Sequence, residues 1–170
     1  MPAAPRPDFG ELYDRSFAKV YNYAVYRLGD PAAADDVASR VFERALDRLD
    51  SFDPSRGPAD AWLFGIARNA VNDHFRERRW LSWLPFDLIE GRTGERDAGE
   101  GALIKDEEQR ALLAALGSLD ARQRELLALK FGGKMTNRDI AAQTGLSESH
   151  VGVLVFRAVK KLQGILGAEG

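Results

Sequence analysis

The stretch TNRDIAAQTGLSESHV, residues 136–151, has the residue pattern that decides the fold of this chain. Its spacing is typical of a helix-turn-helix, in which two short helices cross at a tight turn. Ala141 is small where the two helices would cross closely, and Gly145 permits the left-handed residue that ends the first helix. The apolar wedge that fixes the crossing angle is predicted to be Ile140, Leu146 and Val151. An ordinary helical hairpin with a glycine turn shows a similar pattern and is the alternative interpretation.

The residues after the turn include the groups that contact DNA in such an element. The exposed positions of the second helix, predicted to face the major groove, are Ser149, His150, Gly152 and Val153. Arg157, Lys160 and Lys161 then form a basic end without a nearby acid. Because such cations contact phosphates, they favour DNA binding over the plain hairpin.

The composition is that of a globular protein with a packed core. Of the 170 residues, 45% are hydrophobic and 29% are charged, which argues against a disordered chain. The chain has no cysteine, so disulfides, thiolate zinc sites and cysteine nucleophiles are excluded. Residues 1–7 show no signal-peptide pattern, and no apolar run reaches the roughly 18 residues of a membrane span. We therefore expect a cytoplasmic protein without membrane insertion.

The charge is unevenly distributed along the chain. The net charge of −2 is unusual for a DNA-binding protein, which is usually basic. Basic residues gather at Arg68 and at 76–79, whereas acids gather at 35–36, 90–100 and 106–108. Phosphate contact depends on local charge, so the acidic average does not exclude DNA as a partner.

Apolar residues recur at three- and four-residue steps along nearly the whole chain, which predicts helices. In the first half, three such patterns are separated by Gly29-Asp30-Pro31 and by the Pro-, Gly- and Asp-rich residues 51–58. In the second half, Asp120 with Gln123 three residues later resembles a capping box. We predict an all-α fold in which the three helices of the first half form a bundle.

A composition change near the middle of the chain predicts two small domains. Residues 80–86 are aromatic and apolar, and residues 90–101 are rich in glycine and charge, as a linker is. We expect a first domain at 1–84, a linker at 85–101 and a second domain at 102–170. Two interpretations of the apolar stretch stay open, docking on the first domain and docking on a partner.

Both halves resemble regions of the extracytoplasmic-function sigma factors, the two-domain class of bacterial RNA polymerase sigma factor. Residues 116–125, LGSLDARQRE, and the helix-turn-helix through Val151 are similar to region 4 of that family. In the first half, ADDV at 34–37 with VF at 41–42 is similar to the polymerase-binding helix of region 2, and AWLFGIARN at 61–69 to its promoter-melting and −10 helix. The resemblance covers most of the chain in the family's order.

The resemblance implies a sigma factor that directs promoter-specific initiation, without catalysis and without a cofactor or metal. Its implied partners are the RNA polymerase core (the β′ clamp and the β flap), promoter DNA and an anti-sigma factor. The residues implied in core polymerase binding are Asp36, Val37, Arg40, Val41 and Phe42. Those implied at the −10 strand are Trp62, Arg68, Asn69, Arg76, Arg78 and Arg79. Those implied at the −35 element are Arg138, Ser147, Ser149, His150, Gly152, Val153, Arg157 and Lys160.

The chain departs from the family pattern in two places. Ser39 and Arg40 stand where the family usually has Gln and an acid, and a reversed charge on a protein surface changes which partner fits it. Gly152-Val153-Leu154 stands where basic residues are frequent, and a glycine inside a helix weakens it by roughly 1 kcal/mol. Modest DNA affinity is therefore expected from the second domain alone.

Other interpretations remain for single residues and for the whole chain. Asp35 and Asp36 are more simply explained by the helix dipole than by a metal site. Of the two histidines, His74 is predicted on the surface beside the arginines and His150 at the DNA. The alternative functions are a conventional helix-turn-helix regulator and an adaptor that binds polymerase or an anti-sigma factor without initiating transcription.

Overall fold

The computed structural model describes residues 6–83 and 106–168, and all regular structure within them is helical, which confirms the predicted all-α class. The first half contains α1 (Phe9–Leu28), α2 (Pro31–Asp47), the 3-10 turns η1 (Leu49–Ser51) and η2 (Pro54–Arg56), and α3 (Ala59–Ser82). The second half contains α5 (Glu107–Gly117), α6 (Ala121–Leu127), the π-helical segment η3 (Ala128–Gly132), α7 (Asn137–Thr144) and α8 (Glu148–Ala168).

Local capping groups set the helix boundaries where the sequence predicts them. Gly29 adopts a left-handed φ of 71° and ends α1, and the Asp30 carboxylate then accepts a hydrogen bond from the Ala32 amide to begin α2. At α6 the capping box is complete, since Asp120 accepts from the Gln123 amide and Gln123 accepts from the Asp120 amide. These boundaries follow from short-range hydrogen bonds.

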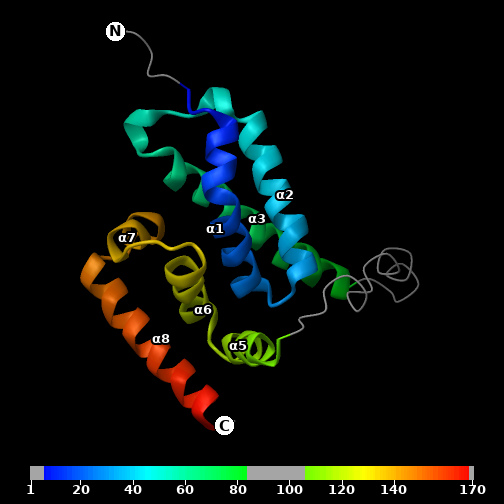
Figure 1. Cartoon of the computed structure of the whole chain (residues 1–170), viewed down its shortest axis with the longest axis vertical. Coiled ribbons are helices and arrows are strands. Elements are labelled where there is room, and N and C mark those ends of the chain that lie inside the picture. Colours follow the sequence, from blue (N-terminus) through cyan, green and yellow to red (C-terminus); the bar gives the residue numbers. More distant parts are fainter. Residues whose placement is uncertain (1–5, 84–105, 169–170) are drawn as a thin grey trace.

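The three helices of the first half pack side by side as a bundle (Figure 1). Its centre is apolar and almost fully buried, with exposed fractions of 1% or less for Leu12, Val20, Val37, Val41, Leu63 and Val71. These side chains recur at helical spacing on the inward faces of α1, α2 and α3, so burying them provides the main stabilisation of the bundle.

The second half packs directly against the first, with η3 lying on α1. A Cβ atom on Gly132 would lie 2.8 Å from the Tyr23 amide nitrogen and 2.9 Å from the Asn22 carbonyl oxygen, closer than side chains tolerate. Gly132 therefore permits the backbone of η3 to approach the backbone of α1. The buried apolar cluster is continuous across both halves, and α8 packs on α5, α6 and α7 (Figure 1).

The structure describes the beginning of the apolar stretch at residues 80–86. Helix α3 continues through Trp80 to Ser82, so the first residues of this stretch are helical. Trp80 is 60% exposed and Trp83 is 86% exposed, so neither indole docks on the first half. The remainder of the apolar stretch and the linker at 85–101 lie outside the described residues, and the domain limits stay a prediction.

His74 was expected on the surface but is buried, with an exposed fraction of 5%. It lies three residues after Val71 on the inward face of α3, and its ring meets the Phe75 ring edge to face at 6.3 Å. The surface prediction is therefore wrong, because the helical position outweighs the basic neighbours in sequence. None of the helices in the described ranges is long and apolar enough to span a bilayer.

Candidate nucleic-acid interface

Helices α7 and α8 form the helix-turn-helix predicted from the sequence. Gly145 adopts a left-handed φ of 78° and ends α7, and the Ser147 hydroxyl accepts a hydrogen bond from the His150 amide at 3.1 Å. Ile140 and Val151 are fully buried between the helices, and Leu146 is half-buried. The apolar wedge therefore packs as expected and fixes how α8 is presented.

The residues predicted to meet the −35 element lie on the outer face of this motif. Seven of the eight are exposed, namely Arg138, Ser147, Ser149, His150, Val153, Arg157 and Lys160. Gly152 is half-buried, and α8 runs through it without a break. A Cβ atom there would make only an ordinary contact, 3.5 Å from the Asn137 side-chain nitrogen.

Phe156 also belongs to this face, although it is not among the residues predicted from the sequence. Its side chain is 63% exposed, and the Lys160 ammonium lies 5.6 Å from the ring centroid. The signal was present in the spacing, since Phe156 follows the exposed Val153 by three residues and falls outside the buried series Val151, Val155 and Ala158.

The basic end of α3 is the second candidate surface. Arg76, Arg78 and Arg79 are exposed there, and Asn69 is exposed nearer the middle of the helix. Within the described residues, Arg76 is held by Asp73 at 2.5 Å, whereas Arg78 and Arg79 make no ion pair. Trp62 is half-buried and its ring meets Phe52 edge to face at 5.4 Å, so in this arrangement much of its surface is used for packing.

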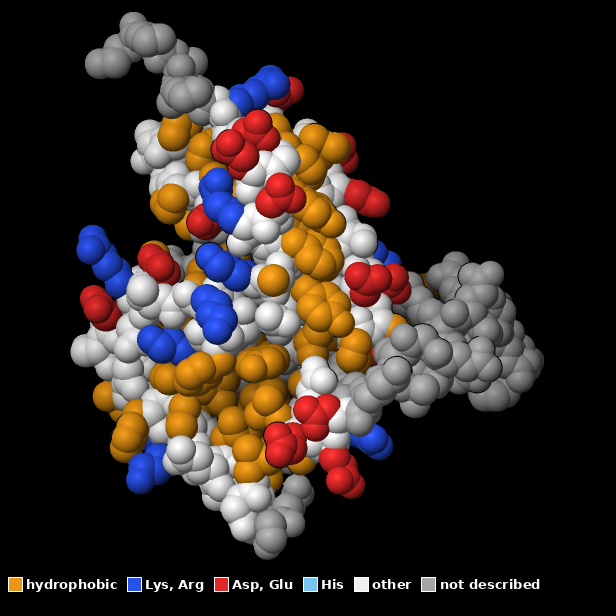
Figure 2. All heavy atoms as spheres, viewed as in Figure 1, with side chains coloured by type: hydrophobic (Ala, Val, Ile, Leu, Met, Phe, Trp, Pro, Cys, Tyr) orange, Lys and Arg blue, Asp and Glu red, His pale blue; other side chains and the backbone are white. Residues whose placement is uncertain are grey.

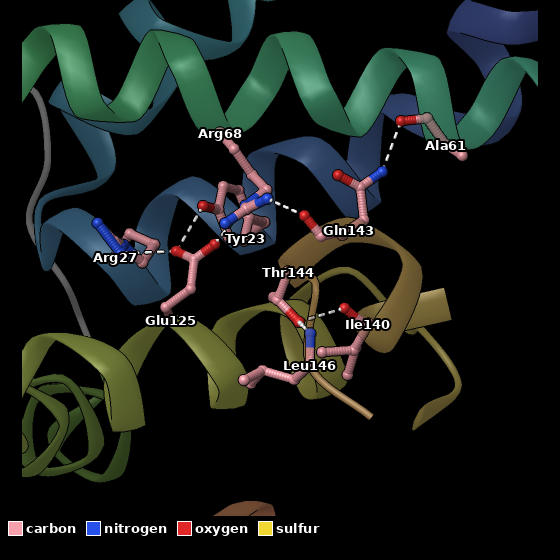
Figure 3. Close-up of polar contacts among 9 residues, drawn as sticks. All are labelled: Tyr23, Arg27, Ala61, Arg68, Glu125, Ile140, Gln143, Thr144 and Leu146. Atoms are coloured by element: carbon pink, nitrogen blue, oxygen red, sulfur yellow. Dashed lines mark hydrogen bonds and ion pairs between the residues drawn. The ribbon is translucent and has the colours of Figure 1, made fainter. Parts of the chain in front are cut away.

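Arg68, the remaining residue predicted at the −10 strand, is bound by the second half of the chain (Figure 3). Its Nε donates to Glu125 Oε1 at 2.8 Å, and its Nη1 donates to the Gln143 carbonyl oxygen at 2.5 Å. The Gln143 side chain in turn donates to the Ala61 carbonyl oxygen at 2.6 Å. Polar contacts from α6 and α7 thus cover the middle of α3.

Glu125 is the centre of these contacts, which we call the Glu125 cluster: Tyr23, Arg27, Arg68 and Glu125. Besides Arg68, its carboxylate accepts from the Tyr23 hydroxyl at 2.8 Å and from Arg27 Nη1 at 2.6 Å. The Glu125 side chain is 15% exposed and that of Arg27 is 10% exposed, so water screens the pair weakly. Burial, and then the charge of Glu125, raises the pKa of Tyr23 well above 10.0. Tyr23 therefore stays protonated and keeps donating to Glu125.

The helix predicted to bind polymerase is only partly available at the surface. Val37, Val41 and Phe42 have exposed fractions of 1%, 0% and 4%. They hold α2 in the bundle, so the prediction that these three side chains contact a partner directly is corrected. Asp36 is exposed. Arg40, which carries the reversed charge, forms an ion pair with Glu77 of α3, with 3.4 Å between Nη1 and Oε2.

Exposed apolar side chains also lie on the outer surface of α1 and α2. Figure 2 shows hydrophobic side chains in a stripe over these two helices. Tyr13 is 40% exposed and packs on Phe42 at 4.8 Å between ring centroids, and Leu46 is 54% exposed. No group of His, Asp and Glu in the described residues is arranged to hold a metal ion.

A helix-turn-helix with an exposed polar face, attached to a helical bundle with a basic helix end, defines a two-part DNA-binding transcription protein. Two family models match the corresponding segments, Sigma-70 region 2 at residues 12–81 and Sigma-70 region 4 at residues 109–162. Together with the relatives below, they show that the chain belongs to the extracytoplasmic-function (ECF) RNA polymerase sigma factors.

Three relatives illustrate the similarity. BldN of Streptomyces coelicolor, an ECF sigma factor, is 35% identical over 93% of this chain, which spans 60% of that protein's length. The ECF sigma factor RpoE of Cereibacter sphaeroides is 33% identical, with 81% of this chain and 75% of that protein aligned. The sigma factor CnrH of Cupriavidus metallidurans is 33% identical, with 95% and 87% aligned.

Two solved structures share the fold. CnrH in complex with the cytosolic domain of CnrY has a TM-score of 0.67 at 29% identity, covering 95% of this chain and 89% of that one. RpoE of Bartonella quintana in complex with the anti-sigma factor NepR has a TM-score of 0.71 at 23% identity, covering 96% and 99%, and supports the fold alone. The family membership identifies a sigma factor that directs transcription initiation, and it does not favour a conventional helix-turn-helix regulator.

Proposed function

We propose that this chain initiates transcription by placing the exposed face of α7 and α8 on the −35 element and the basic end of α3 on the −10 strand. The observation that carries the proposal is the exposure of seven of the eight predicted −35 residues on one helix-turn-helix. Ser149 and His150 supply hydrogen-bonding groups near the start of α8, and Val153 supplies an apolar contact of the kind a thymine methyl takes. Arg157 and Lys160 are suited to phosphates.

The first half contributes charge to the unpaired strand. Arg78 and Arg79 are exposed at the end of α3, and cations along a groove hold a single strand through its phosphates. Arg68 is proposed to contact the same strand, but in the described arrangement it is hydrogen-bonded to Glu125. Binding of the −10 strand therefore requires the second half to move off α3.

Distance gives an independent reason for this opening. The −10 and −35 elements are about 25 base pairs apart, which is about 85 Å of duplex at about 3.4 Å per base pair. A compact chain of this length has a diameter of only about 40 Å. The 24 residues between Ser82 and Glu107 reach about 80 Å when fully extended, and the widths of the two halves add to this reach, so the two halves can occupy both elements.

Polymerase binding is proposed at the exposed edge of α1 and α2. Asp36 and Arg40 supply charge there, and Tyr13 and Leu46 supply exposed apolar surface of the kind that protein partners cover. The similar structures contain CnrY and NepR, so an anti-sigma factor is proposed as a further partner. The chain is proposed to act beside polymerase in the cytoplasm, as a binding factor without catalytic activity.

In vitro transcription with core polymerase tests the initiation mechanism. Promoter-specific transcripts are expected only when this chain is added. Arg79→Ala and Arg157→Ala should each reduce initiation severalfold, because each removes a phosphate contact. The matched control is Arg122→Ala, an exposed arginine on α6 outside both surfaces. Unchanged initiation by both test variants would contradict the assignment of the surfaces, and an absence of specific transcripts over many templates would favour the adaptor.

A further inference from the structure

A cavity of about 770 Å³ lies between the end of α3 and the start of α6. Five arginines line it, Arg27, Arg76, Arg78, Arg79 and Arg124, and no acidic residue of the described chain does. Arg27 comes from α1, the next three from α3, and Arg124 from α6 of the other half. The cavity is therefore complete only while the two halves are packed together.

The positive charge around this cavity is not balanced by the neighbouring carboxylates. Glu125 already forms ion pairs with both Arg27 and Arg68, at 2.6 and 2.8 Å. Asp73 of α3 likewise serves both Arg44 and Arg76, at 3.1 and 2.5 Å. Within the described residues, Arg78, Arg79 and Arg124 make no ion pair, so the cavity walls carry an excess of cations that an anion would stabilise.

Two of the arginines are held close together at the inner wall. Arg124 is half-buried and its Nε donates to the Tyr26 carbonyl oxygen at 2.7 Å, near the end of α1. Burial, and then the charge of Arg27, lowers the pKa of Arg124. Arg27 is 8% exposed, and its Nε is buried without a hydrogen-bond partner. These cations are fixed in position by the fold, although their mutual repulsion opposes it.

The cavity also has an apolar wall. Phe75 lines it, with the Arg27 guanidinium carbon 5.3 Å from the ring centroid, and Leu119 and Ala121 extend the wall from the second half. A purely inorganic anion would leave this wall uncovered. An aromatic group attached to phosphates would cover it, because bases stack on aromatic rings and on guanidinium planes.

We propose that this cavity is a binding site for a nucleoside polyphosphate, with the phosphates held by Arg79 and Arg124 and the base lying against Phe75. Its volume is within the range of pockets that bind small molecules. Since the walls come from both halves, bound nucleotide stabilises the closed arrangement and competes with the −10 strand for the α3 arginines. The site depends on the closed arrangement and not on which promoter is read.

Equilibrium dialysis of the isolated full chain at about 0.15 M salt tests the site with ATP and with tripolyphosphate as probes. Polymerase is left out because it binds nucleotides itself. ATP is expected to bind more tightly than tripolyphosphate. Arg79→Gln and Arg124→Gln should each weaken ATP binding about tenfold, as the loss of a charge-assisted hydrogen bond does. Arg122→Gln, on the same helix as Arg124 but away from the cavity, should leave ATP binding unchanged.

The variant Phe75→Leu distinguishes the contribution of the base to binding from that of the phosphates. It should weaken ATP binding and leave tripolyphosphate binding unchanged. Arg79 is exposed, so its variant reports on the site even if Arg124→Gln disturbs the end of α1. Equal binding of ATP and tripolyphosphate would overturn the proposal. ATP binding that is unchanged in both arginine variants would also overturn it. So would binding of duplex DNA without any binding of ATP. The initiation assay stands apart, since failure here leaves promoter-specific transcription unaffected.

Discussion

Replacing Glu125 by glutamine should open the molecule without unfolding either half. Glu125 accepts hydrogen bonds from Tyr23, Arg27 and Arg68, and its side chain is 15% exposed. The substitution removes the charge and points an amide NH2 at an arginine donor. A charge-assisted hydrogen bond contributes about 1.5–3 kcal/mol, but Arg68 is 28% exposed and regains water on opening. We expect a net shift of about 2–3 kcal/mol, which is about 30- to 150-fold in the equilibrium between closed and open forms.

Small-angle X-ray scattering of the isolated chain measures this shift. A compact chain of 170 residues has a radius of gyration of about 16 Å, and separation of the halves should raise the radius of gyration above about 22 Å. Single-stranded −10 DNA should bind the variant more tightly because Arg68 is released. The matched control is Glu43→Gln on α2, an exposed acid outside the cluster, which should leave both quantities unchanged. A Glu125→Gln protein as compact as the unaltered one would refute the reasoning, as would a cooperative loss of helix.

Three further predictions concern single positions. Gly132→Ala should also open the molecule, because the added Cβ atom would lie 2.8 Å from the Tyr23 nitrogen, and overpacking of this kind costs about 1–3 kcal/mol. Small-angle scattering measures the opening. Gly164→Ala is the control, because a Cβ atom at Gly164 faces open space. Gly152→Ala should stabilise α8 by up to about 1 kcal/mol and raise Tm by about 2–4 °C, and a lower Tm would count against it. The closed form should weaken as pH rises through about 10, where Tyr23 ionises in the open chain but, with its raised pKa, not in the closed one. Tyr23→Phe should flatten that dependence in denaturation experiments.

The fold accommodates both departures from the family pattern. Arg40 forms an ion pair with Glu77 of α3, so its charge is partly neutralised within the bundle. Gly152 leaves α8 continuous, and only an ordinary contact with the Asn137 side chain lies beside it. The reversed charge at Arg40 and the missing basic residues after Val151 therefore alter the surface of the protein without altering the fold.

Much of the fold was predictable because short-range groups specify it. The capping box of Asp120 and Gln123, the left-handed Gly145 and the Ser147 cap each act over a few residues, and each is found where its pattern predicts it. Helical spacing of apolar residues likewise predicts which face of each helix is buried, so the all-α class and the helix-turn-helix follow from the sequence alone.

What only the tertiary structure decided is which side chains remain free to bind a partner. The same apolar spacing that identifies α2 buries Val37, Val41 and Phe42 in the bundle, and the inward face of α3 buries His74. Arg68 looks like a DNA contact in the sequence, yet it is bound by Glu125, 57 residues away. Burial and pairing of this kind depend on how distant helices pack, which no local pattern encodes. The helix-turn-helix was thus predictable from residues 136–151, whereas the contacts by which the second half covers the middle of α3 were not.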